Sequence, residues 1–187
     1  MHKYIPKFFA ITDTYDESLF KHNTSNFGII YRNYKLNKSC IELNKIALNC
    51  RKRGIAFFVS NNTRLAIKYK ATGIYIPSFN RSGVKHILFA KKNLLVLGSA
   101  HNIKEINEKI NQGCDAIFLS PIFQTKNYKK VLGIYKFNIL TKSKKIKFYA
   151  LGGLNNSNLK KLKVLNAVGF GAINLYKKNR PKLMGRF

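Results

Sequence analysis

Eight short apolar runs, each closed by polar or glycine residues, recur along this chain of 187 residues. The most informative run, 116–119, stops at Ser120 and Pro121 and opens into a loop that carries Gln124 and Thr125. An apolar run that ends in hydrogen-bonding residues is typical of parallel α/β folds, where ligands bind beyond the carboxyl ends of the strands. We expect strands at residues 8–13, 26–32, 55–59, 73–76, 94–97, 116–119, 148–151 and 171–175.

Segments with helical spacing lie between most of these runs. In the best marked one, Asn102 can cap the helix, Glu105 follows three residues later as in a capping box, and Gly113 ends it. Other helical segments are expected at 17–22, 39–53, 63–70, 84–91 and 156–166. Strands that alternate with helices in this way predict an α/β fold, a single-domain (β/α)8 TIM barrel over residues 1–187.

The C-terminal end departs from a complete barrel. Only residues 176–187 follow the eighth run, and Pro181 and Gly185 would interrupt a closing helix. The chain is also shorter than the ~200 residues at the lower end for this fold. We therefore expect the last helix to be short or missing, and a second subunit of a homo-oligomer could cover that edge.

A formal net charge of +28, from 35 Lys and Arg against 7 Asp and Glu, admits three interpretations. A cationic surface favours nucleic acid, and a positive field also speeds the capture of small polyanionic substrates. The lysines, however, are spread over nearly every segment and accompanied by Asn and Ile, as a compositional bias of the genome would produce. We favour such a bias, or an anionic small substrate, over nucleic acid.

The targeting and redox features point to one compartment. No apolar run approaches about 18 residues, and the N-terminal residues lack the apolar core of a signal peptide, so we expect no membrane span. The cysteines, Cys40, Cys50 and Cys114, are odd in number and lack metal-ligand spacing. Reduced thiols in the core fit this pattern better than disulfides or nucleophiles. We expect a cytoplasmic protein.

In such a barrel, the polar residues after the strands converge on one rim. Most of them are hydrogen-bond donors or cations, which suits a ligand with phosphate groups. Gly152 and Gly153 would let backbone amides approach a phosphate, and the loops after the last two strands are the usual phosphate cradle of this fold. The candidate rim residues are Arg32, Lys35, 60–62, 78–81, Ser99, His101, 125–130, Gly152, Gly153 and Tyr176.

Several segments, taken in order, resemble the thiamine-phosphate synthase/TenI family. They are Phe-Ala-Ile-Thr-Asp at 9–13, Gly-Ile-Tyr-Ile at 73–76, Ser-Ala-His at 99–101, Gly-Cys-Asp-Ala at 113–116, Pro-Ile-Phe-Gln-Thr at 121–125, and Ala-Leu-Gly-Gly-Leu-Asn at 150–155. The segment 121–125 is the most specific of these. The resemblance implies a reaction that joins hydroxymethylpyrimidine diphosphate to thiazole phosphate, releasing diphosphate and forming thiamine phosphate, with Mg²⁺ bound to the leaving group.

The resemblance also implies roles by position. Arg32 and Lys35 would hold the diphosphate, Ser99 would contact the diphosphate or the pyrimidine, and Lys129 stands near the place of a catalytic lysine. Thr125 would bind the thiazole phosphate or nearby groups, and Gly153 with the loop at Tyr176 would bind the thiazole phosphate, with Gly152 as a further substrate-binding candidate. His101 fits a residue at a helix start with a local hydrogen bond better than it fits a catalytic group.

The chain departs from the family where the resemblance implies carboxylates that hold magnesium. It has Ser60, Asn61 and Asn62 at one such place and Asn80 at the other. A neutral amide oxygen binds a hard cation more weakly than a carboxylate does, which leaves Asn61 and Asn80 as weak candidate ligands for Mg²⁺ and, with Asn62, candidate substrate contacts.

Two hypotheses therefore stay open. In the first, the chain is a synthase in which Arg81, Lys126, Lys129 or a substrate-held magnesium offsets the missing charge. In the second, it is a diverged protein that binds thiazole phosphate or another small phosphate, or is tautomerase-like, although Pro121 stands where the tautomerase branch has a histidine.

Overall fold

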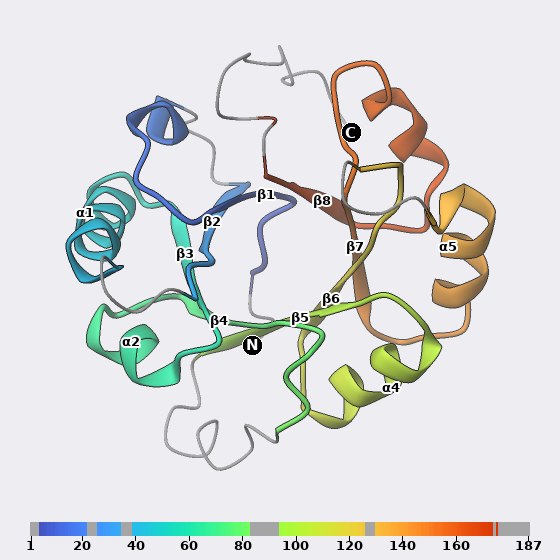
Figure 1. Ribbon diagram of the computed structural model, residues 1–187, viewed down its shortest axis with the longest axis horizontal. Helices are drawn as coiled ribbons and strands as arrows, with labels where there is room; N and C mark the ends of the chain where they lie inside the picture. The colour runs from blue at the N-terminus through green and yellow to red at the C-terminus, as the bar shows by residue number, and fades with distance from the viewer. Residues whose placement is uncertain are drawn as a thin grey trace.

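Eight parallel strands close into a barrel in the computed structural model, and they follow their order in the sequence from β1 to β8 (Figure 1). The structure describes residues 4–21, 26–34, 39–82, 94–125, 130–173 and 175. The barrel closes where β8 pairs with β1, and this confirms the predicted fold. The strands are β1 Phe8–Thr12, β2 Phe27–Tyr31, β3 Ala56–Ser60, β4 Gly73–Ile76, β5 Leu95–Ala100, β6 Ala116–Leu119, β7 Lys147–Leu151 and β8 Gly169–Ala172.

The helices lie around the outside of the ring of strands (Figure 1). They are α1 Ser39–Lys52, α2 Thr63–Lys68, α4 Ile103–Asn111 and α5 Gly133–Thr141, with short 3-10 helices η1 Glu17–Lys21 and η2 Leu159–Val164. Asn102 caps α4 as expected, since its side chain accepts a hydrogen bond from the Glu105 amide. None of the helices among the described residues is long and apolar enough to cross a membrane.

Two cores lie on either side of the barrel wall. Inside the barrel, the Phe118 ring centroid lies 5.2 Å from that of Phe9, 5.9 Å from that of Tyr75 and 5.0 Å from that of Tyr149. The larger core fills the space between the strands and the helices. Because both faces of the strands are buried, the strands appear in the sequence as continuous apolar runs rather than as alternating patterns.

Glycines account for two wrong strand boundaries. β5 runs to Ala100 rather than 97, because Gly98 lies inside the strand, where a Cβ would be 2.8 Å from the Cys114 sulfur. β8 begins at Gly169 rather than at residue 171. A Cβ on Gly169 would overlap the Lys7 carbonyl oxygen. Each glycine is needed for close packing and does not end a strand.

Helix predictions after β6 were less successful. Helix α5 was not predicted, because Leu132, the N-cap residue before it, makes no side-chain capping bond and so gives no capping signal. The helix expected at 156–166 is the shorter η2. The expected helix at 84–91 and the shortened last helix after residue 175 lie outside the described residues. Coverage of that edge by a second subunit stays a prediction.

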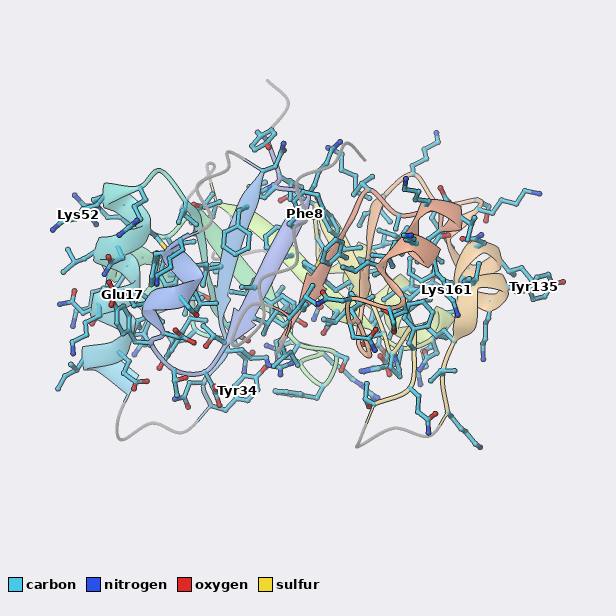
Figure 2. All side chains as sticks on the ribbon, turned by 90° about the horizontal axis from the view of Figure 1, so that it is seen from above. Phe8, Glu17, Tyr34, Lys52, Tyr135 and Lys161 are labelled. Carbon is cyan, nitrogen blue, oxygen red and sulfur yellow. The ribbon has the colours of Figure 1, made fainter. Side chains whose placement is uncertain are left out.

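Phe8 and Tyr34 lie at opposite ends of the barrel (Figure 2). Phe8 begins β1 and Tyr34 follows β2, so the carboxyl ends of the parallel strands face the end marked by Tyr34. At the described thiols, burial raises the pKa of Cys50 and of Cys114 to about 12. Both are buried and free, which confirms that they lie in the core. The side chain of Cys40 lies outside the described part of the structure.

Candidate active site

A buried tyrosine joins two of the predicted catalytic residues at the rim. Tyr75 of β4 is 2% exposed and lies inside the barrel, where it is close enough to Ser99 of β5 and to Arg32, which follows β2, for both residues to influence its hydroxyl. Burial raises the pKa of Tyr75 to about 12, although Ser99 and Arg32 act in the opposite direction. The phenol is therefore neutral at physiological pH and leaves the Arg32 charge available to an anion.

Tyr75 was missed as a site residue because it reads as an ordinary strand residue. Its signal was available, since a tyrosine one residue before a strand end can place its hydroxyl at the rim. Ser99 also differs from expectation. It lies within β5 and is 5% exposed, so it belongs to the upper wall of the barrel rather than to a loop.

An exposed aromatic pair stands beside Ser60, the last residue of β3. The Tyr34 and Ser60 hydroxyl oxygens are 3.1 Å apart, and the Tyr34 ring meets Phe79 edge-on with centroids 5.5 Å apart. Phe79 is 64% exposed and Tyr34 47% exposed. Aromatic surface at the rim suits contact with a flat heterocycle. Phe79 lies in the predicted rim segment 78–81, whereas Tyr34 was not predicted to belong to the rim.

Asn61 and Asn80, the candidate magnesium ligands, bind each other. The Asn80 amide nitrogen donates to Asn61 Oδ1 at 2.5 Å, and Asn80 Oδ1 accepts from the Ser82 amide at 2.8 Å. Asn61 has a φ of 56°, a left-handed conformation that asparagine tolerates better than most residues. The structure thus brings the two predicted residues together as a pair that links the loops after β3 and β4.

Asn62 has a structural partner of its own. It caps α2, accepting a hydrogen bond from the Leu65 amide at 3.0 Å. Its side-chain oxygen therefore faces the helix it begins, and this capping bond explains the residue without a ligand.

These asparagines do not fit a magnesium ion. Each carries no charge, and the side-chain oxygens of Asn61, Asn62 and Asn80 already accept hydrogen bonds. Within the described part of the chain, no group of three or more His, Cys, Asp or Glu side chains could hold a metal ion. A hard divalent cation prefers several charged oxygens, which these three asparagines do not supply.

The loops after β6 and β7 pack tightly on each other. The Phe123 amide donates to the Gly152 carbonyl at 3.1 Å. Gly152 and Gly153 have φ of 91° and 73°, and a Cβ on Gly153 would collide with the Phe123 carbonyl oxygen. The two glycines are thus required by backbone conformation and by this contact. Thr125 follows on the same loop and is half-buried.

His101 follows β5 and bonds locally, as expected. Its Nδ1 lies 2.8 Å from Glu105 Oε2, and the same oxygen accepts from the His101 amide at 2.8 Å. A cavity of about 340 Å³ lies beside it, lined by His101, Pro121, Lys130, Val131, Leu132 and Lys136. Its two lysines give this part of the rim positive charge. The remaining predicted site residues, Lys35, Lys129 and Tyr176, lie outside the described residues, as does Lys126.

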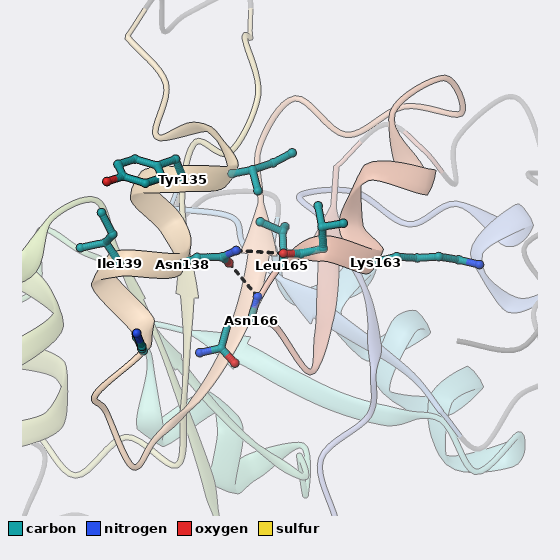
Figure 3. Close-up of a pocket in the computed structure, with 9 residues that line it drawn as sticks. Tyr135, Asn138, Ile139, Lys163, Leu165 and Asn166 are labelled. Carbon is teal, nitrogen blue, oxygen red and sulfur yellow. Dashed lines mark hydrogen bonds between the residues drawn. The ribbon is translucent and has the colours of Figure 1, made fainter.

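A cavity of about 740 Å³ lies elsewhere, on the outer surface between α5 and η2 (Figure 3). Asn138 ties its walls together, donating to the Val164 carbonyl and accepting from the Asn166 amide, both at 2.8 Å. No predicted site residue lines this cavity, and it is a packing groove between two helices.

A family model described as thiamine monophosphate synthase matches residues 27–174. The chain belongs to the thiamine monophosphate synthase family. The matched range contains Arg32, Tyr75, Ser99 and the Gly152–Gly153 pair, so the rim described above lies within the family's domain.

Named relatives of this family agree with the assignment. A thiamine-phosphate synthase of Prochlorococcus marinus subsp. pastoris is 36% identical over 130 residues, which cover 67% of this chain and 36% of the relative. A putative thiamine-phosphate synthase 2 of Aquifex aeolicus is 26% identical over 185 residues, covering 92% of this chain and 98% of the relative. The chain thus spans little more than a third of the first relative and nearly all of the second.

A solved structure supports the fold. Thiamine phosphate pyrophosphorylase from Pyrococcus furiosus superposes with a TM-score of 0.74 at 20% identity, covering 93% of this chain and 88% of that chain. At this identity the likeness concerns the barrel itself.

Proposed function

We propose that this chain condenses hydroxymethylpyrimidine diphosphate with thiazole phosphate, forming thiamine phosphate and releasing diphosphate. The observation that carries the proposal is the Arg32–Tyr75–Ser99 arrangement at the carboxyl ends of β2, β4 and β5. Membership of the thiamine monophosphate synthase family supports the same reaction.

The reaction calls for stabilisation of a departing anion. The bond between the pyrimidine methylene carbon and the diphosphate oxygen breaks with its electron pair on oxygen, and the thiazole nitrogen lone pair forms the new bond to that carbon. Arg32 would bind the developing negative charge, and the Ser99 hydroxyl would donate to the leaving group or to the pyrimidine. Tyr75 would keep both groups in place without adding negative charge.

The second substrate would lie against the loops after β6 and β7. In this proposal Thr125, Gly152 and Gly153 contact the thiazole phosphate, and Lys130 and Lys136 add positive charge nearby. Lys35, Lys129 and Tyr176 keep the roles implied by the family resemblance. The rings of Tyr34 and Phe79 would contact one of the two heterocycles.

Magnesium receives no protein ligand set in this proposal. Because the rim asparagines bind each other or cap a helix, any magnesium that accompanies the reaction would have to arrive on the diphosphate. The small phosphorylated substrates and the lack of a membrane-spanning helix among the described residues fit a cytoplasmic role, which is part of the proposal.

A second candidate function rests on the Asn61–Asn80 pair. If these amides mark the loss of diphosphate chemistry, the chain binds thiazole phosphate or another small phosphate without turning it over. Binding would then use the loops after β6 and β7, and Arg32 would be dispensable.

A product assay separates the two functions. Purified protein is incubated with both substrates, with and without magnesium, and thiamine phosphate is measured beside an Arg32→Ala variant. Product that appears with the parent and falls by about 100-fold in the variant supports the synthase. Measurable thiazole phosphate binding without product, unchanged in Arg32→Ala, supports the binding protein.

A further inference from the structure

Lys109 of α4 is a lysine with no exposed surface. Lysine is almost never fully buried unless its ammonium is paired. Burial lowers the pKa of Lys109, and the nearby Cys114, Glu108 and Glu105 oppose that change. Taking an ammonium out of water is unfavourable, so the burial of Lys109 lowers the stability of the folded protein.

The barrel wall has made room for this side chain. Gly98 of β5 lies beneath it, and a Cβ there would be 3.0 Å from Lys109 Cδ and 3.1 Å from Cγ. Gly98, which was predicted to follow the end of the strand, is where the aliphatic part of Lys109 crosses β5. A lysine stem and a glycine are therefore fitted to each other across α4 and β5.

The amino group ends on the loop after β4. Lys109 Nζ donates to the Asn80 carbonyl at 2.6 Å and to Gln112 Oε1 at 2.9 Å. Gln112 in turn donates to the Asn80 carbonyl at 3.0 Å and to the Ser82 carbonyl at 2.8 Å. The partners of the buried charge are neutral oxygens, and they belong to the loop or to the residue that helps to hold it.

The same helix face makes one further link to this loop. Glu108 Oε2 lies 3.8 Å from Arg81 Nε. The loop so held carries Asn80, whose side chain binds Asn61 after β3, and Phe79, whose ring meets Tyr34. Restraint of the backbone at 80–82 is therefore passed to two neighbouring parts of the rim.

We propose that Lys109 is a positioning residue, which with Gln112 holds the loop after β4 in the conformation that the rim needs for reaction. It touches no substrate, and it acts through Asn80 and the loop backbone. The effect on turnover rests on the proposed function, whereas the effect on the loop does not.

The test compares Lys109→Met with Lys104→Met in the full-length chain. Methionine keeps most of the length of the stem but cannot donate, and Lys104 is an exposed lysine of the same helix. Hydrogen exchange is followed at the Asn80 and Ser82 amides, which bond to the Pro77 carbonyl and to Asn80 Oδ1. Thermal unfolding and the kcat and KM of the product assay are measured on the same samples.

We expect exchange at 80 and 82 to rise at least about tenfold in Lys109→Met, with kcat falling by a similar factor, KM changing less and Tm almost unmoved. Lys104→Met should match the parent. Unchanged exchange at both amides would overturn the proposal, as would a rise spread evenly over the barrel with a lower Tm. If the parent makes no product, exchange alone still decides the role of Lys109. Should Lys109→Met fail to fold, Gln112→Leu, which removes the other donors to this loop, must give the same local rise.

Discussion

Asn80 donates its side-chain amide to Asn61 Oδ1 at 2.5 Å, across the gap between the loops after β3 and β4. Each member of the pair is neutral, and the pair occupies the place where the family resemblance implies charged metal ligands. A hydrogen bond between amides can hold two loops together as a bridging cation does, but it needs no ion.

Magnesium alone should leave the parent protein unchanged. We expect no shift in Tm up to millimolar concentrations. The Asn61→Asp/Asn80→Asp variant should be less stable than the parent, because two facing carboxylates repel each other. Added Mg²⁺ should then stabilise that variant by roughly 3 kcal/mol at about 100 times its Kd. Calorimetric titration without any substrate provides the measurement, and a clear Mg²⁺ isotherm for the parent would contradict the prediction.

The Tyr75 hydroxyl should matter for activity more than for folding. Tyr75→Phe removes the link between Arg32 and Ser99, and we expect kcat/KM to fall about tenfold through poorer positioning. Tyr149→Phe is the matched control, since the Tyr149 hydroxyl is also buried but bonds to the Pro6 carbonyl at the far end of the barrel. Each variant should lose about 1 kcal/mol of stability. Equal kinetics in the two variants would show that the link is not used.

Asn62 should behave as a helix cap. Asn62→Ala is expected to lower the unfolding free energy by about 1 kcal/mol and Tm by about 2–4 °C, with little effect on KM. Asn102→Ala, which removes the equivalent cap of α4, should give a similar loss. A large rise in KM for Asn62→Ala at unchanged Tm would instead indicate direct contact with substrate.

Gly153 should tolerate no side chain. Gly153→Ala combines an unfavourable φ with a collision against the Phe123 carbonyl, and we expect a loss of more than about 2 kcal/mol in urea unfolding. Gly54→Ala is the control, because Gly54 has a φ of 63° but nothing within 4 Å of the added Cβ. That variant should lose only about 1 kcal/mol. Similar losses would mean that the loops after β6 and β7 can move apart.

The Glu105 contacts should make stability depend on pH. Burial raises the pKa of Glu105, but hydrogen bonds from His101 and Asn102 outweigh it and leave the pKa below its ordinary value of 4.5. A lowered carboxyl pKa stabilises the fold above that ordinary value and stops doing so as pH falls through the folded-state pKa. The Tm difference between parent and Glu105→Gln should therefore be larger at pH 6 than at pH 3. A Tm difference that is the same at pH 6 and pH 3 would contradict this prediction.

The sequence predicted the barrel because burial on both faces of the wall leaves long apolar runs with polar ends. Arg32 was predicted as a rim residue for the same reason, since it directly follows such a run. Tyr75 and Lys109 were missed because each resembles its neighbours in type. A tyrosine in a strand suggests packing, and a lysine in a helix suggests solvent. Only the closed barrel shows that Tyr75 reaches the rim and that Lys109 reaches the loop after β4.

The Asn61–Asn80 pair could not have been predicted as a contact. The two residues are 19 positions apart, and their meeting depends on the left-handed turn at Asn61 and on the position of the loop after β4. What the sequence did contain was the joint absence of carboxylates from both places. In the structure, Asn61 and Asn80, which stand in those two places, form a direct hydrogen bond with each other.

Closure of the barrel between β8 and β1 also affects how the chain folds during synthesis. Phe8 pairs with Phe170, so this hydrogen-bonded seam joins the first and the last strand of the barrel. Until β8 is synthesised, β1 and β7 remain open edges rich in aromatic and aliphatic residues, which can recruit other chains. Fragments that stop short of residue 169 are therefore expected to aggregate during expression, and nascent chains to depend on chaperones until this seam closes.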